Sequence, residues 1–188
     1  YSSAASDVYK RQLLHRACPP GVQLVCAPRK PQRFEEAAAA LLGCTRRSRK
    51  ERAQPGQERF LLDSIGELSG MYSLADVVVV GRSFLGLYGS DPIEPVALGK
   101  ATVIGECVTD FANIVKAFVE ARGIVQTSAA ELAGVLAGLM ASDQARQELA
   151  ARGLEVIANE KGASQRHRDL LVAEVARVRN KNGISSNP

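Results

Sequence analysis

The stretch Asp76-Val77-Val78-Val79-Val80-Gly81 decides how the rest of the chain is interpreted. Four consecutive β-branched residues favour a strand, and a run without alternating polar residues is typical of a parallel strand covered on both faces. A second buried run, Ala101-Thr102-Val103-Ile104, ends at Gly105. We therefore predict a parallel sheet whose central strand is Val77–Val80.

Short apolar runs alternate with amphipathic stretches along most of the chain, which is the pattern of repeated strand-helix-strand units. Strands are predicted at residues 22–27, 60–62, 77–80, 101–104 and 124–125. Helices are predicted at residues 33–42, 67–75, 92–99, 111–121, 129–140, 145–159 and 170–178, and a charged loop at 45–57. The predicted fold class is α/β, with a Rossmann-like parallel sheet flanked by helices.

The two ends of the chain differ from its middle. Residues 1–12, YSSAASDVYKRQ, show neither helical nor strand periodicity, do not begin with Met and resemble a translated sequencing-adaptor scar. We interpret them as a non-native or disordered leader, in a chain that is a fragment or a processed product. Residues 181–188 are polar and are expected to form a disordered tail. The predicted domain is residues 13–180.

Composition excludes several classes of protein. The chain has 188 residues, a net charge of +4 and no uncharged run longer than 12 residues, so no membrane-spanning helix is predicted and the chain is expected to be soluble. Aromatic residues make up 5% and Trp is absent, which does not favour base stacking on nucleic acid.

The cysteines and histidines do not predict a metal site. The four cysteines, which lack the spacing of a zinc motif or a disulfide framework, are Cys18, Cys26, Cys44 and Cys107. His15 and His167 have no carboxylate or Cys at metal-ligand spacing. We expect reduced thiols, no metal and no cofactor.

Ligands of an open parallel sheet bind beyond the carboxyl ends of its strands, so the loops after the predicted strands are the candidate sites. The first, Ala27-Pro28-Arg29-Lys30-Pro31, places two cations where a phosphate or carboxylate would bind. The second is Asp63-Ser64-Ile65-Gly66-Glu67-Leu68, where Gly66 lets the backbone approach a ligand. The alternatives are a solvated turn at the first loop and, at the second, a Glu67 that only complements the helix dipole.

The third loop, residues 81–95, contains three glycines before Pro92 and has two carboxylates at its end. Asp91 and Glu94 are three residues apart, so they would share one face of a helix and could accept hydrogen bonds from the hydroxyls of a ribose. The alternative is a capping arrangement in which Asp91 caps the helix and Glu94 supports it.

Residues 46–52, RRSRKER, contain five cations. Such a run is most often a solvated, flexible loop, and we interpret it so. Contact with anionic lipid headgroups or with nucleic acid is the alternative.

Three segments together resemble a known family: APRKPQRF (27–34), LLDSIGELSGMYSLADVVVVGRSF (61–84) and GSDPIEPVALGKATVIG (89–105). In this order they resemble the C-terminal half of the 3-deoxy-D-manno-octulosonic acid (Kdo) transferases of lipopolysaccharide synthesis, over about residues 22–180. The resemblance implies the two-domain B-type glycosyltransferase fold. Its C-terminal domain would bind CMP-Kdo, and its N-terminal domain would supply the lipid A precursor site and the catalytic carboxylate.

The resemblance also implies which residues bind CMP-Kdo. They are Pro28, Arg29, Ile65, Gly66, Glu67, Asp91, Pro92, Ile93 and Glu94, with Arg82, Ser83 and Ser90 as further candidates. The Arg29 guanidinium would meet the phosphate or the sugar carboxylate, because its planar donors match both groups. Glu94 would hold the ribose.

Five positions depart from the family pattern. Lys30 stands where His is usual, Arg82 replaces a Gly, and Tyr88, Ser90 and Asp91 replace Gly, His and Asn. Asp91 lacks the amide donor of Asn, while Arg82 adds a cation that could compensate near an anionic donor. Another CMP-activated keto-acid sugar is therefore an alternative donor.

The resemblance predicts the donor-binding half of a glycosyltransferase that moves Kdo from CMP-Kdo to a lipid A precursor. The catalytic residues would lie outside this chain, which is expected to bind the donor but hardly turn it over. The full-length enzyme would contact the cytoplasmic face of the bacterial inner membrane peripherally, without a nucleic-acid partner. The alternative is a stand-alone nucleotide or nucleotide-sugar binding module without catalysis.

Overall fold

The computed structural model describes residues 17–84 and 88–181. The leader predicted at residues 1–12 and nearly all of the predicted tail lie outside the described residues. The strands are β1 (Leu24–Cys26), β2 (Thr45–Arg46), β3 (Arg59–Leu61), β4 (Val77–Val80), β5 (Ala101–Ile104) and β6 (Val125–Gln126). The helices are α2 (Phe34–Ala40), α3 (Leu68–Leu74), α4 (Ile93–Ala97), α5 (Ala112–Glu120), α6 (Leu132–Ala141) and α7 (Asp143–Lys181), with 3-10 turns at η1 (Pro31–Arg33), η2 (Gly81–Ser83) and η3 (Thr109–Phe111).

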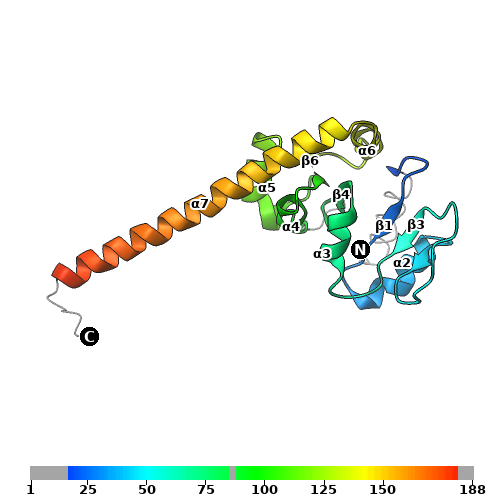
Figure 1. The fold of residues 1–188 in the computed structure, drawn as a ribbon, viewed down its shortest axis with the longest axis horizontal. Helices are drawn as coiled ribbons and strands as arrows, with labels where there is room; N and C mark the ends of the chain where they lie inside the picture. The colour runs from blue at the N-terminus through cyan, green and yellow to red at the C-terminus, as the bar shows by residue number, and fades with distance from the viewer. Residues whose placement is uncertain (1–16, 85–87, 182–188) are drawn as a thin grey trace.

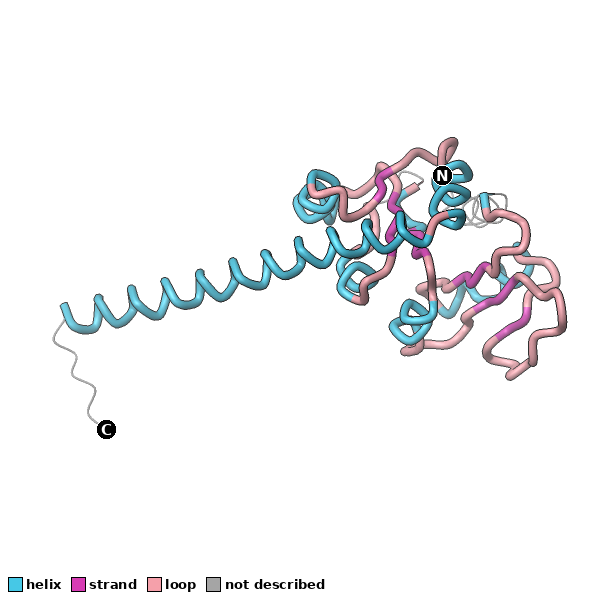
Figure 2. The backbone as a smooth tube through the Cα atoms, turned by 45° about the horizontal axis from the view of Figure 1, so that its top comes forward, coloured by secondary structure: helices cyan, strands magenta, loops and turns pink. Residues whose placement is uncertain are grey.

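The strands form two parallel three-stranded sheets, ordered β1-β3-β2 and β4-β5-β6. Figures 1 and 2 show the helices packed around both sheets, with α7 extending far beyond the rest of the molecule. The prediction of an α/β fold with parallel strands flanked by helices is confirmed. Within the described residues, no helix combines the length and the apolar character needed to cross a membrane.

The central strand of the second sheet is β5, and the prediction that Val77–Val80 is central is wrong. All four residues of β5 are buried, whereas buried and half-buried residues alternate along β4. The reason is position, because β5 pairs with β4 on one side and β6 on the other, while β4 pairs with β5 alone in this sheet. Val103 and Ile104 therefore enter two different hydrophobic clusters, one on each face of the sheet.

Two other predictions are corrected. The segment 45–57, expected to be a loop, begins with the strand β2, which two polar residues form without any apolar periodicity. The helices expected at 145–159 and 170–178 are one continuous helix, α7. The sequence between Asp143 and Lys181 contains no proline, so no residue there blocks the helical hydrogen bonds.

Glycines let α7 pack closely on the second sheet. A Cβ atom added at Gly153 would lie 2.7 Å from the Val96 side chain and 2.9 Å from the Gly123 carbonyl oxygen. These distances are shorter than carbon contacts allow, so only glycine fits at this crossing. The contact places α7 against α4 and against the turn that precedes β6.

Candidate functional site

The carboxyl ends of the first sheet meet at one edge. Cys26, the last residue of β1, and Arg46, the last residue of β2, are both in register with Leu61, the last residue of the central strand β3. The loops that follow the three strands therefore leave the sheet side by side. In parallel α/β folds this edge is where ligands bind.

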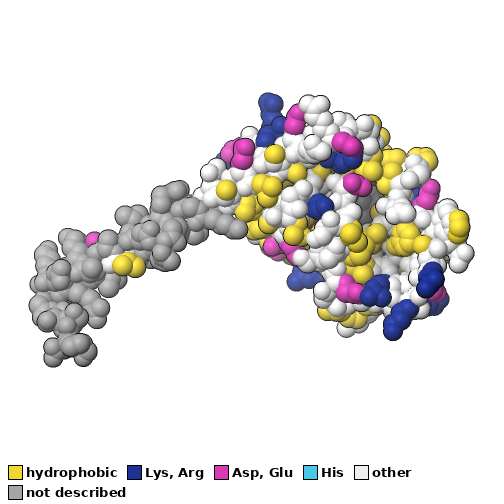
Figure 3. All heavy atoms as spheres, viewed as in Figure 1, with side chains coloured by type: hydrophobic (Ala, Val, Ile, Leu, Met, Phe, Trp, Pro, Cys, Tyr) yellow, Lys and Arg dark blue, Asp and Glu magenta, His cyan; other side chains and the backbone are white. Residues whose placement is uncertain are grey.

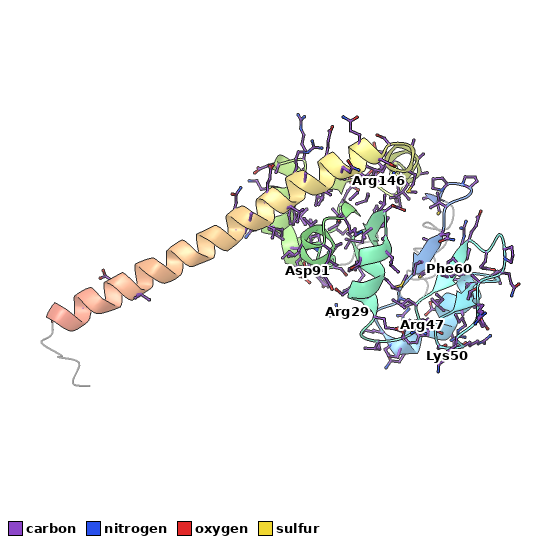
Figure 4. All side chains as sticks on the ribbon, viewed as in Figure 1. Arg29, Arg47, Lys50, Phe60, Asp91 and Arg146 are labelled. Carbon is purple, nitrogen blue, oxygen red and sulfur yellow. The ribbon has the colours of Figure 1, made fainter. Side chains whose placement is uncertain are left out.

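The first loop carries the predicted residues Pro28 and Arg29. Pro28 is half-buried, and Arg29 and Lys30 are exposed just before the 3-10 turn η1. In Figure 4, Asp91 is labelled beside helix α3, and Arg29 is labelled near the lower end of the same helix. The Arg29 guanidinium is thus an accessible cation next to the end of β1, as the sequence predicted.

The second loop begins with a buried ion pair. The Asp63 carboxylate accepts hydrogen bonds from Arg46 Nε at 2.7 Å, from the Ser48 backbone N–H at 2.7 Å and from the Ser48 hydroxyl at 2.6 Å. Two further donors of Arg46 contact the Glu35 carboxylate at 2.6 and 2.9 Å. Burial alone would raise the pKa of Asp63, but the hydrogen bonds from Ser48 and Arg46 outweigh it and lower the pKa to about 2.

This network corrects the prediction that the basic segment 46–52 is a solvated loop. Arg46 is only 8% exposed and belongs to the interior of the domain. The remaining residues of the segment are exposed. In Figure 3, the Lys and Arg side chains over the first sheet, at the lower right, are interspersed with acidic side chains.

The second loop ends with another ion pair, at Glu67. Arg47 donates from Nε and Nη2 to Glu67 Oε1 at 3.0 and 2.6 Å, and the Ser64 hydroxyl donates to the other carboxylate oxygen. The hydrogen bond from Ser64 and then that from Arg47 lower the pKa of Glu67. Between these anchors Ile65 is 67% exposed, and Gly66 is exposed with a left-handed φ of 88°.

The first turn of the third loop, η2, contains the candidate Ser83, which the structure buries completely. Its hydroxyl donates to the Val80 carbonyl and accepts the Gly105 N–H at 2.6 Å. A Cβ atom at Gly105 would lie only 2.3 Å from the Ser83 carbonyl oxygen, so the two turns are in direct contact. Ser83 has no surface for a ligand and instead holds the turn after β4 against the end of β5, while Arg82 is half-buried.

The end of the third loop presents two exposed carboxylates. Asp91 Oδ1 accepts the Ile93 backbone N–H at 2.7 Å, so the expected alternative of a capping role is present in part. Helix α4 nevertheless begins at Ile93 and has Pro92, which is buried, as its N-cap residue. Glu94 is exposed in the first turn of α4, and Ser90 is half-buried.

Tyr72 lies on α3, the helix that follows the second loop, and sequence reasoning did not identify it as part of the site. Burial, followed by the negative charges of Glu94 and Asp91, raises the pKa of this phenol. Tyr72 thus lies on α3 near both carboxylates. The Lys100 ammonium donates to the Ser73 carbonyl at 2.8 Å and ties α3 to the start of β5. No local pattern in the sequence marks Tyr72, because its place depends on two helices meeting.

The site offers cations, carboxylates and exposed backbone rather than metal ligands. Among the residues that the structure describes, no group of three or more His, Cys, Asp or Glu side chains is arranged to hold a metal ion. An Arg and an exposed turn suit an anionic group, and exposed carboxylates suit hydroxyl groups. The fold and the site define a parallel α/β domain of the nucleotide-binding type.

Comparisons with known proteins find similarity to 3-deoxy-D-manno-octulosonic acid transferases. The chain is 34% identical over 158 residues to the 3-deoxy-D-manno-octulosonic acid transferase of Haemophilus influenzae, covering 81% of this chain and 37% of that protein. It is 34% identical over 164 residues to the Bordetella pertussis enzyme of the same name, covering 84% and 38%. A probable mitochondrial 3-deoxy-D-manno-octulosonic acid transferase of Arabidopsis thaliana is 32% identical over 114 residues, covering 57% and 26%.

The fold matches a solved structure as well. The crystal structure of the C-terminal CMP-Kdo binding domain of WaaA from Acinetobacter baumannii aligns with a TM-score of 0.71 and 28% identity, over 79% of this chain and 83% of that one. No protein-family model matches the chain. The chain is thus similar to the Kdo transferases over 81% and 84% of its own length in the two bacterial comparisons. It spans 37% and 38% of the length of the two bacterial relatives.

Proposed function

We propose that this chain is the donor-binding half of a glycosyltransferase that moves Kdo from CMP-Kdo to a lipid A precursor. The observation that carries the proposal is the fold match to a C-terminal CMP-Kdo binding domain, with a TM-score of 0.71. The candidate residues lie on the loops beyond the carboxyl ends of the strands or, for Ile93 and Glu94, in the first turn of the helix that follows, which is where nucleotides bind in parallel α/β folds.

The charges of the site fit an anionic nucleotide-sugar. CMP-Kdo carries a phosphate and a sugar carboxylate, and the exposed Arg29 is the cation that would neutralise either group. Glu94 would accept hydrogen bonds from the ribose hydroxyls. Asp91 already accepts the Ile93 N–H through one oxygen, which leaves its other oxygen for a ligand.

The reaction is a displacement at the anomeric carbon of Kdo. A hydroxyl of the acceptor forms the new bond to this carbon, and the bond to the phosphate oxygen breaks, so that CMP leaves with the electron pair. Arg29 stabilises the charge that develops on the phosphate. The base that takes the proton of the acceptor would come from a part of the enzyme outside this chain.

The acceptor determines the proposed location. A lipid A precursor is held in a membrane, so the full-length enzyme would work in peripheral contact with the cytoplasmic face of the bacterial inner membrane.

Calorimetric titration of CMP, with UMP and AMP as controls, tests the proposal. We expect CMP to bind this chain selectively, and Arg29→Ala and Glu94→Ala each to weaken binding about tenfold, since lost charge-assisted hydrogen bonds are worth about 1.5–3 kcal/mol before solvent screening. Lys116→Ala and Glu120→Ala are matched controls, because this exposed pair lies on α5. A folded chain without preference for CMP would contradict the proposal.

A further inference from the structure

The end of β2 holds the second loop at both of its ends. Arg46 and Ser48 bind Asp63, the residue before the turn, and Arg47 binds Glu67, the residue after it. Three consecutive residues thus contact both ends of a five-residue segment that follows the central strand.

The first anchor is rigid because its charges are buried and fully paired. The Asp63 side chain has no exposed surface, and that of Arg46 is 10% exposed. A carboxylate in such a place must receive several hydrogen bonds, and Arg46 and Ser48 supply three. The bond from Arg46 to Glu35 fixes the guanidinium to α2 as well.

The second anchor contains Glu67, the carboxylate that the resemblance implies would bind the donor. Arg47 binds one oxygen of Glu67 through two donors, and Ser64 donates to the other oxygen. What the segment leaves exposed is the turn itself, Ile65 and Gly66. Only a turn held at both ends presents this backbone in one conformation.

We propose that Arg46, Arg47 and Ser48 are positioning residues of the donor site, and that Glu67 acts through Arg47 on the turn rather than by contacting the donor. The inference rests on the proposed function and deepens it. The donor would meet the exposed backbone of Ile65 and Gly66, while both flanking carboxylates remain engaged within the protein.

The second anchor, Arg47–Glu67, is the one to test by mutation. These side chains are 52% and 38% exposed, so their removal leaves no cavity in the core. The first measurement is the NMR relaxation and hydrogen exchange of the Gly66 and Ile65 amides without nucleotide. We expect faster motion and exchange in Arg47→Ala and in Glu67→Ala, with partial rescue in Arg47→Lys. Arg49→Ala is the matched control, since this exposed cation pairs with Glu51 instead.

The second measurement is a double-mutant cycle on CMP affinity. We expect Arg47→Ala and Glu67→Ala each to weaken binding about three- to tenfold, and the double variant no more than either alone, because one contact is broken in all three. Additive losses would show that Arg47 or Glu67 contacts the nucleotide directly and would overturn the proposal. Unchanged Gly66 and Ile65 amides would also overturn it.

The two measurements separate this inference from the proposed function. If neither the parent chain nor any variant binds CMP, the proposed function fails. The amide measurements then still decide whether Arg47 and Glu67 hold the turn. If CMP binds the parent chain and Arg47→Ala alters neither the amides nor the affinity, only the positioning role fails.

Discussion

Arg46 Nε donates to Asp63 Oδ2 over 2.7 Å, joining the end of β2 to the residue at the start of the second loop. The two residues are 17 positions apart in the sequence. Both side chains are almost completely shielded from solvent, so each charge needs the compensation that it receives here, from the other residue and from Ser48 and Glu35. This pair determines how the loop beyond the central strand begins.

Removing one partner of this pair should lower the free energy of unfolding more than removing an ordinary surface charge does. We expect Asp63→Ala to lower the free energy of unfolding by about 3–5 kcal/mol, because Arg46 and Ser48 lose their acceptor in a buried place. Urea denaturation measures the change. Asp76→Ala, at an exposed aspartate, is the control, and an equal loss in both variants would contradict the prediction.

The same carboxylate should make stability depend on pH. The pKa of Asp63 in the folded chain is about 2 and its ordinary value is 3.8. Because the folded-state pKa is depressed, the Asp63 carboxylate contributes about 2 kcal/mol to the free energy of unfolding. This contribution is fully present above about pH 4 and is lost as the pH falls towards 2. The free energy of unfolding, measured at several pH values, should differ less and less between the parent and Asp63→Asn as the pH falls through this window. A constant difference would contradict the prediction.

The crossing of α7 over the second sheet requires glycine. We expect Gly153→Ala to lower the free energy of unfolding by about 1–3 kcal/mol through overpacking against Val96 and Gly123. Gly138→Ala is the matched control, because a Cβ atom there meets nothing within 4 Å and alanine should stabilise α6 by about 0.5–1 kcal/mol. Thermal unfolding compares the two variants, and a stabilised Gly153→Ala would show that α7 does not pack this closely.

Tyr72 should report the approach of α3 to α4. Burial and the charges of Glu94 and Asp91 raise the pKa of Tyr72 above its ordinary value of 10.0. Glu94→Gln removes one negative charge, so the phenol should ionise at a lower pH, although burial keeps part of the shift. NMR titration of the tyrosine ring measures it. Glu106→Gln serves as control. An unchanged pKa of Tyr72 in Glu94→Gln would show that α3 and α4 do not approach each other in this way.

Much of the candidate site could be predicted because it lies where local patterns change. Arg29, Gly66 and Glu94 follow recognisable strands, and their loops do leave the carboxyl ends of parallel strands. Their roles towards a donor remain predictions. Ser83 is a candidate through the family resemblance, but its burial depends on Gly105, which directly follows the next strand.

The sequence by itself determined the α/β class, the order of most strands and helices, and the resemblance to Kdo transferases, because periodicity and short motifs are properties of neighbouring residues. Only the tertiary structure decided that β5 is central, that Arg46 is buried and that Tyr72 lies near Glu94. Each of these depends on residues distant in the chain, whose burial and charge pairing are set when strands and helices pack together. Arg46 belongs to a charged segment that is expected to be solvated, and only the folded chain brings the Asp63 carboxylate, from the loop after β3, to within 2.7 Å of it.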